Sequence, residues 1–199
     1  MGEILGMIFR PTATWQRLAS KSDEAIKARL LLILALAAVP ALAFYYGTTQ
    51  VGWNVRGGEI VRITEASATP LAVLFYAALV STIVVIGLMC HWMSKTYDAQ
   101  SFPLKGVVMV GYACVPVYLA GAAAVYPVWG LDILLATLAC SYTIRLLYLG
   151  VPPMMKVPED QGMLYASALF LVFLVYAVVI LTATVILWEY VAAPVFINV

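Results

Sequence analysis

The side chains with the greatest potential for chemistry are a single histidine and three cysteines. His91 stands in the segment Met89-Cys90-His91-Trp92-Met93, where sulfur and imidazole groups are typical ligands of copper or zinc. Neighbouring positions on a helix point in different directions, so these side chains do not converge on one ion. The sequence has no second histidine and no cysteine pair at metal-ligand spacing. We therefore predict no metal site, and we expect Cys90, Cys114 and Cys140 to be small buried packing residues.

Other catalytic arrangements are missing from the sequence as well. No serine, histidine and acid lie at comparable depth, no glycine-rich phosphate loop is present, and no paired carboxylates are available. The sequence therefore predicts a protein that is not an enzyme and that needs no cofactor.

Two charged residues lie at the ends of an apolar run, where a charge is costly in a membrane. Asp132 opens the predicted fourth helix, and there it would cap free amides and complement the helix dipole. Arg145 follows about 20 Å further along the same helix, so the two cannot pair. Arg145 either extends to the lipid headgroups or contributes to a polar site inside the bundle. The sequence leaves both interpretations open.

Five long apolar runs carry these residues and determine the fold class. They are Leu30–Tyr46, Pro70–Met93, Gly106–Tyr126, Ile133–Gly150 and Gly162–Trp188. A bilayer core about 30 Å thick requires roughly 20 apolar residues of helix, and these runs are continuous rather than alternating. With 64% hydrophobic and 11% charged residues, the chain falls outside the range of soluble globular proteins. We predict an all-α integral membrane protein with a bundle of five transmembrane helices.

Basic residues alternate across these runs and predict the orientation. Nine of the eleven lie on the side of the N-terminus: Arg10, Arg17, Lys21, Lys27, Arg29, Lys95, Lys105, Arg145 and Lys156. The opposite side has only Arg56 and Arg62. The positive-inside rule then predicts a cytoplasmic N-terminus and an external C-terminus. The net charge of +1 argues against a nucleic-acid partner.

The segments outside the runs suggest two smaller features. Residues 1–29 form an amphipathic lead-in to the membrane domain of residues 30–199, and we expect two short helices along the cytoplasmic headgroups with Trp15 at the interface. An ordered arm packed on the bundle is the alternative. No cleaved signal peptide is expected. On the external side, residues 53–64 are typical of a small hairpin with a two-residue turn at Gly57-Gly58. The hairpin would serve as a structural cap or as a binding lid.

Small residues recur at four-residue spacing on three runs, as the pairs Ala37 and Ala41, Ala77 and Ser81, Ala136 and Cys140, and Thr137 and Ser141. Such pairs let helices approach closely in lipid. They predict tight packing within the bundle or against another copy of the chain.

Two motifs in the second half resemble those of a known family. They are Gly111-Tyr112-Ala-Cys-Val-Pro116 in the third run and the segment from Tyr142 through Arg145 and Tyr148 to Pro152 at the end of the fourth. With five spans and the lead-in Phe9-Arg10-Pro11, the chain resembles the Yip (Ypt/Rab-interacting protein) domain family, in particular its small bacterial inner-membrane branch. Eukaryotic members carry an Asp-Leu-Tyr-Gly-Pro segment that this chain lacks.

The resemblance implies a membrane protein that organises lipids or partner proteins without a reaction of its own. In physical terms, Gly111 permits close helix approach and Pro116 bends the third helix. Tyr112 and Tyr148 place hydroxyl groups in the bundle that require partners. Together with Asp132 and Arg145, these are our candidate lipid or partner contacts. We expect membrane lipids, other membrane proteins or a second copy as partners; the competing hypothesis is a small transporter or channel subunit with a polar seam near Arg145.

Overall fold

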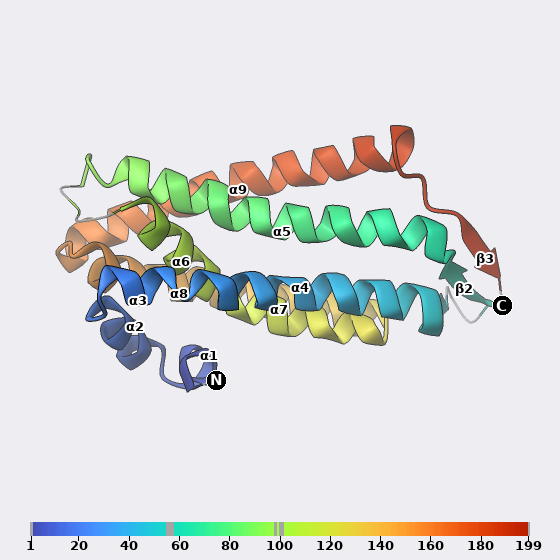
Figure 1. The fold of residues 1–199 in the computed structure, drawn as a ribbon, viewed down its shortest axis with the longest axis horizontal. Helices are drawn as coiled ribbons and strands as arrows, with labels where there is room; N and C mark the ends of the chain where they lie inside the picture. The colour runs from blue at the N-terminus through green and yellow to red at the C-terminus, as the bar shows by residue number, and fades with distance from the viewer. Residues whose placement is uncertain (1, 55–57, 98, 100–101, 199) are drawn as a thin grey trace.

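The computed structural model describes residues 2–54, 58–97, 99 and 102–198, and within them the chain is a bundle of long helices with a small sheet at one end (Figure 1). Three short helices come first: α1 (Gly2–Phe9), α2 (Pro11–Ala19) and α3 (Asp23–Lys27). The long segments are α4 (Leu30–Tyr46) with the π-helical turn η1 (Gly47–Val51), α5 (Glu65–Met93), α6 (Pro103–Ala113), α7 (Val115–Gly121) with the 3₁₀ turn η2 (Ala122–Val125), α8 (Trp129–Met155) and α9 (Glu159–Tyr190).

The membrane-spanning segments match the five predicted runs. Within the described residues, four helices are long and apolar enough to cross a membrane, and the bent pair of α6 with α7 makes a fifth if it is one span. The first predicted run has the same bounds as α4. The helix α5 begins five residues before its run, α8 extends beyond its run by four and five residues at its two ends, and α9 by three and two. Polar residues such as Glu65 and Asp160 occupy these added turns, so hydropathy alone does not reveal them. The all-α, multi-span fold class is confirmed.

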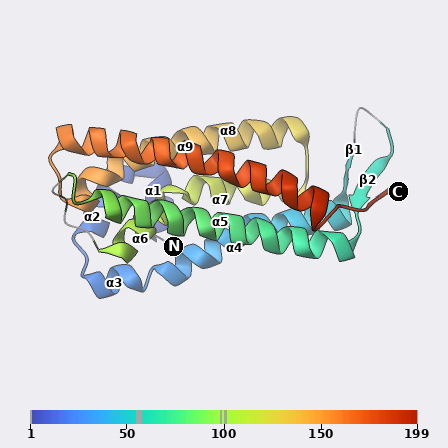
Figure 2. The same cartoon turned by 90° about the horizontal axis from the view of Figure 1, so that it is seen from above.

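The two ends of the bundle differ in structure (Figures 1 and 2). We call the end with α1, α2 and α3 the N end, and the end with the strands the sheet end. Along α8, only Ala139 and Thr143 are buried between Trp129 and Arg145, but no residue from Leu146 to Met155 is exposed. The same change occurs along α9, which has no buried residue after Leu169. The chain is therefore packed tightly at the N end and loosely at the sheet end.

The helices α1 and α2 take part in the core at the N end. Met7, Trp15 and Leu18 are buried in the same hydrophobic cluster as residues of α6 and α8. The Trp15 ring lies against Gly150, where a Cβ would come within 2.8 Å of it. The expected interfacial position of Trp15 is thus wrong: the lead-in is an arm packed on the bundle, because a glycine on α8 leaves room for the indole. Ser22 caps α3 through a hydrogen bond from the Ala25 amide at 3.4 Å.

The helix α6 lies at the centre of the N end. Every residue from Lys105 to Ala113 is buried, because α1, α3, α4, α5 and α8 all contact this helix. Its closest neighbour is α5, where a Cβ on Gly87 would collide with the Val107 backbone and a Cβ on Gly106 would collide with the Gly87 carbonyl oxygen. Two glycines therefore set the distance between α5 and α6.

Three short strands form an antiparallel sheet at the other end, in the order β1 (Trp53–Asn54), β2 (Ile60–Ile63) and β3 (Phe196–Asn198). The pairing of β1 with β2 confirms that the segment folds back on itself. The register pairs Asn54 with Ile60, so the connection is residues 55–59 rather than a two-residue turn; Gly57 of the predicted turn lies outside the described residues. The three-residue strand β3 after α9 was not expected from the sequence.

Candidate functional site

A polar cluster ties the first helix to the third span. The Glu3 carboxylate accepts hydrogen bonds from Arg29 at 2.8 and 2.9 Å and from the Tyr112 hydroxyl at 2.7 Å. Lys21 adds an ion pair with Glu3 at 3.3 Å. Arg29 also donates to the carbonyl oxygen of Ala25 in the preceding helix. Tyr112, one of the candidate residues, thus holds a side chain of the N-terminal arm.

The electrostatics of this cluster favour an ionised Glu3. The hydrogen bonds from Arg29 hold the pKa of the Glu3 carboxyl at about 2, below its ordinary value of 4.5. Partial burial opposes this shift, while Tyr112 and Lys21 add to it. Glu3 is therefore ionised at neutral pH and forms a structural ion pair with Arg29.

Gly111 and Pro116 shape the span on either side of Tyr112. A Cβ on Gly111 would collide with the Ile33 side chain of α4, so the glycine allows α4 and α6 to approach. Pro116 lies in the first turn of α7, directly after a 45° bend between α6 and α7. The bend directs α6 into the packed N end and α7 toward the sheet end.

Arg145 lies on the outside of the bundle. Its side chain is exposed, and the guanidinium carbon lies 5.5 Å from the centre of the Tyr142 ring, a cation–π distance. The Tyr142 hydroxyl donates to the Ile8 carbonyl oxygen at 2.7 Å and so anchors α1. Of the two interpretations of Arg145, the structure favours the outer surface over a polar site inside the bundle.

Tyr148 joins the last two helices. Its hydroxyl lies 2.8 Å from the Ser167 hydroxyl of α9, with either atom able to donate. The Ser167 hydroxyl also donates to its own helix at Met163, at 2.9 Å. Tyr148 thus fixes α9 to α8 near the N end, before α9 becomes exposed.

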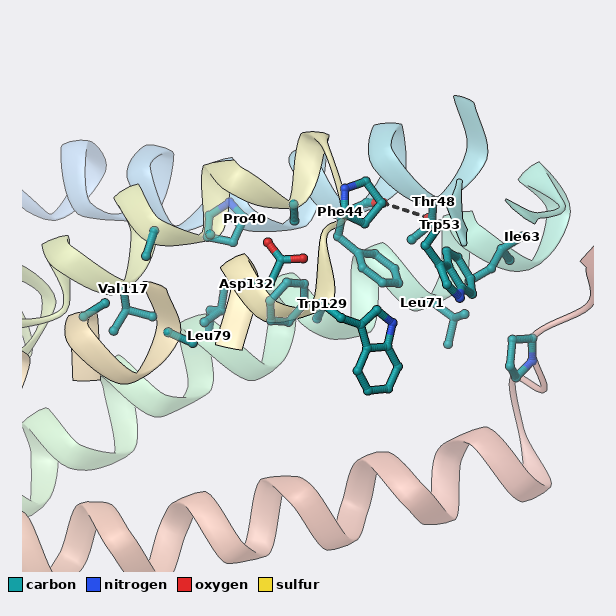
Figure 3. Close-up of a pocket in the computed structure, with 18 of the residues that line it drawn as sticks. Pro40, Phe44, Thr48, Trp53, Ile63, Leu71, Leu79, Val117, Trp129 and Asp132 are labelled. Carbon is teal, nitrogen blue, oxygen red and sulfur yellow. Dashed lines mark hydrogen bonds between the residues drawn. The ribbon is translucent and has the colours of Figure 1, made fainter. Parts of the chain in front are cut away.

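Asp132 is associated with a large cavity at the sheet end, which we call the sheet-end cavity (Figure 3). Its volume is about 620 Å³, and residues of α4, α5, α7, α8, α9 and the strands line it. Asp132 is the one charged residue among the described residues of the lining, and its carboxylate points toward the Pro40 side of the cavity. Asp132 is not the cap that the sequence suggested, because Val128 is the N-cap residue of α8 and no side chain caps that end. It does lie in the first turn of α8, where its charge complements the helix dipole as expected.

A second cavity of about 580 Å³ lies between α5 and α9. It shares Phe44, Leu71, Phe75, Leu79 and Trp188 with the lining of the sheet-end cavity, so the two adjoin.

Two of the four small-residue pairs line these cavities. Ala77 and Ser81 line the second cavity, and Ala136 and Cys140 line the first. These two pairs do not make the tight contacts within the bundle that one interpretation of their spacing predicts, and packing against another copy stays a prediction. Cys140 is exposed rather than buried as expected. Ala37 and Ala41 do pack inside the bundle, where both are buried.

The described residues include no group of three or more histidine, cysteine, aspartate or glutamate side chains that could hold a metal ion. His91 is half-buried in α5. The chemical groups of the site are therefore one carboxylate in an apolar cavity, an ion-pair cluster at the N end and several tyrosine hydroxyls.

The cluster of Glu3, Lys21 and Arg29 was not expected from the sequence. Glu3 and Arg29 are 26 residues apart and belong to different helices, so no helical spacing connects them. The one available signal was the presence of a single acid in the otherwise apolar first helix, Gly2–Phe9.

These features together define a multi-span α-helical membrane protein with a packed N end and apolar cavities at its sheet end. The chain belongs to the Yip1 domain family, whose model matches residues 5–180, and this confirms the resemblance noted from its motifs. It is 31% identical over 190 residues to Inner membrane protein YohC of Escherichia coli strain K12, covering 96% of this chain and 97% of that protein. The protein of the same name from Escherichia coli O6:H1 is similar to the same extent. No solved structure matches the chain.

Proposed function

We propose that the protein is a non-enzymatic component of a bacterial inner membrane that organises lipids or partner membrane proteins. The observation that carries this proposal is the loose sheet end. There, two adjoining apolar cavities of about 620 and 580 Å³ lie between helices whose other faces are exposed. In the most apolar window of α9, only 6% of the residues are buried inside the protein. Such surfaces need lipid chains or other helices as neighbours.

The location follows from the relative in Escherichia coli, whose name places that protein in the inner membrane. We infer the same location here, with the N end in the cytoplasm. The distribution of basic residues supports this orientation, since the loops that contain Lys95 and Lys156 lie at the same end as α1 to α3 (Figure 1). The sheet and the C-terminus are then on the external side.

The alternative function, a small transporter or channel subunit, has less support from the site. It requires a polar seam near Arg145 inside the bundle, but Arg145 is exposed and stacks on Tyr142. The hydroxyl of Tyr142 is bonded to the backbone of α1. The observed arrangement therefore gives these polar groups a structural use.

Crosslinking in native membranes tests the proposal. Cys140 is exposed on α8 while Cys90 and Cys114 are buried, so a bismaleimide should react at one position. We expect crosslinked products, either a dimer or a complex with another membrane protein, and we expect their loss in Cys140→Ala. Mild-detergent purification with mass spectrometry then identifies the lipids and proteins that accompany the chain. A chain that crosslinks to nothing and retains no lipid, but that supports saturable solute flux in vesicles lost in Arg145→Leu, contradicts the proposal.

A further inference from the structure

The sheet-end cavity has the size and walls of a ligand site. Its volume of about 620 Å³ lies within the range of about 300–1,000 Å³ common for small-molecule sites. Phe44, Leu71, Phe75 and Leu79 give it apolar walls. Trp129 and Ala136 line the cavity and are also exposed, so we infer that its mouth lies beside them on α8. A chain from the surrounding bilayer therefore has access to the cavity from the side.

The Asp132 carboxylate is the polar group of this cavity that has capacity to bind. Among the described residues, it has no ion pair within 4.0 Å and no hydrogen bond that would satisfy it. The Thr48 hydroxyl also lines the cavity, but it already donates to the Phe44 carbonyl oxygen at 2.7 Å. An ionised carboxylate acts only as a hydrogen-bond acceptor, and its two oxygens can accept from several N–H donors.

Asp132 also lies at the depth of lipid headgroups. The 27 residues of α8 extend about 40 Å, which exceeds the hydrocarbon thickness of about 30 Å. Asp132 is three residues, or about 4.5 Å, from the start of that helix. Tyr126 and Trp129 are exposed beside it, as is typical of aromatic residues at a membrane interface. A ligand bound at Asp132 therefore has its head at the interface and its tail in the cavity.

The charge of the sheet end determines which charge on the ligand headgroup is favoured. The segments at this end contain the acidic residues Glu59, Glu65, Asp132 and Glu189, against only the basic residues Arg56 and Arg62. An excess of acidic residues attracts a cation and repels an anion. No basic residue is present among the described lining residues to bind a phosphate inside the cavity.

From these observations we propose that the sheet-end cavity binds one acyl chain of a membrane lipid with a primary ammonium headgroup, and that Asp132 accepts hydrogen bonds from that ammonium. This inference rests on the proposed lipid-organising function and specifies the lipid chemistry. A primary ammonium suits Asp132 because it donates charge-assisted N–H bonds, whereas a trimethylated ammonium has the same charge but no donor.

Lipid retention by the full-length protein tests this proposal. The protein is reconstituted in nanodiscs of equimolar phosphatidylethanolamine and phosphatidylglycerol, released into mild detergent, and examined by native mass spectrometry. We expect retention of phosphatidylethanolamine over phosphatidylglycerol by about tenfold or more, as a hydrogen bond to a charged group would give. Replacing phosphatidylethanolamine by phosphatidylcholine should remove most of that preference.

Three variants locate the effect at the cavity. Asp132→Asn should abolish the headgroup preference, and Asp132→Glu should keep it. Ala136→Leu, which fills the mouth, should reduce retention of either lipid. The matched control is Glu189→Gln, because Glu189 is an exposed acid at the same end that does not line the cavity, and it should leave retention unchanged. Melting temperatures confirm that each variant is folded.

Three results would each overturn the inference. Equal retention of the two lipids by the unmodified protein contradicts the headgroup preference while leaving the lipid-organising function intact, and this comparison needs no variant. If folded Asp132→Asn still prefers phosphatidylethanolamine, a group other than Asp132 recognises the headgroup. Retention of no lipid at all contradicts this inference and the lipid half of the proposed function together.

Discussion

Glu3 is the residue on which the attachment of the N-terminal helices depends. It receives hydrogen bonds from Arg29 of the α3–α4 junction and from Tyr112 of α6. With 22% of its side chain exposed, it is sheltered enough for these bonds to affect stability. One carboxylate thus connects three segments that are far apart in the sequence.

The pH dependence of unfolding should report this contact. Arg29 lowers the pKa of Glu3 from 4.5 to about 2. The folded state therefore favours the ionised carboxylate of Glu3 more strongly than the unfolded state does. The stabilisation, of order 2 kcal/mol, is fully present above about pH 4.5 and is lost as the pH falls toward 2. Glu3→Gln should remove this part of the pH dependence, measured by thermal unfolding in detergent. Glu24→Gln is the control, because Glu24 is an exposed glutamate in α3. If the two substitutions changed the pH dependence of unfolding equally, the role of Glu3 would be contradicted.

Arg145, unlike Glu3, should contribute little to the stability of the folded protein. Since it is exposed and its observed contact is with the face of Tyr142, we expect Arg145→Leu to change the unfolding free energy by about 1 kcal/mol or less. Arg29→Leu should cost more, about 2–4 kcal/mol, because it leaves a partly buried Glu3 without its main partner. Folded protein in membranes and its melting temperature measure both. Complete loss of folded protein in Arg145→Leu would indicate an ionic partner that the structure does not show.

At the scale of elements, α6 organises the bundle. It is buried at every position from Lys105 to Ala113, and its closest approach is to α5. Helices in lipid associate through packing of small residues, because the surrounding chains are as apolar as their side chains. Gly87 and Gly106 supply that packing here, and they are 19 residues apart on antiparallel neighbours.

Gly87→Ala should therefore be destabilising. Its Cβ would collide with the Val107 backbone, which cannot move without shifting α6. We expect a loss of about 1–3 kcal/mol, the usual cost of overpacking, seen as a lower melting temperature in detergent. Gly130→Ala is the matched control, since a Cβ there meets nothing within 4 Å. Should Gly87→Ala be as stable as Gly130→Ala, α5 and α6 do not approach as closely as described.

At the scale of the whole molecule, the two ends are packed differently. The N end is held by an ion-pair cluster, buried aromatic residues and glycine contacts. The sheet end consists of helices that diverge around cavities and are joined beyond the bundle by the strands. This asymmetry matches the charge distribution, with most basic residues at the N end and an excess of acidic residues at the sheet end.

Reporter fusions should decide the orientation of the whole molecule. We expect a reporter that is active only outside the cytoplasm to be active when fused after Val199, because nine of the eleven basic residues then lie on the cytoplasmic side. Fusion after Lys156, between the fourth and fifth spans, should give the complementary result with a cytoplasmic reporter. Activity of a cytoplasm-only reporter at the C-terminus would reverse the assignment.

The sequence by itself determined the properties that depend on local composition. Continuous apolar runs located the spans, in the case of Leu30–Tyr46 to the residue, because the bilayer requires a helix wherever such a run crosses it. Ser22 as a cap and the strand pair around residues 53–63 were also predictable, since both rest on neighbouring residues. The motifs Gly111-Tyr112 and Pro116 indicated the family, which the match over residues 5–180 confirms.

Only the tertiary structure decided which residues meet. It placed Trp15 against Gly150 instead of at the interface, joined Glu3 to Arg29 and Tyr112, and added β3 to the sheet. It also showed that Ala136 and Cys140 border a cavity with Asp132, whereas their spacing alone predicted a helix contact. The physical reason is that a small residue permits close approach without requiring it. Whether a helix or a space lies beside that residue depends on how α6 and the N-terminal arm fill one end of the bundle and leave the other open.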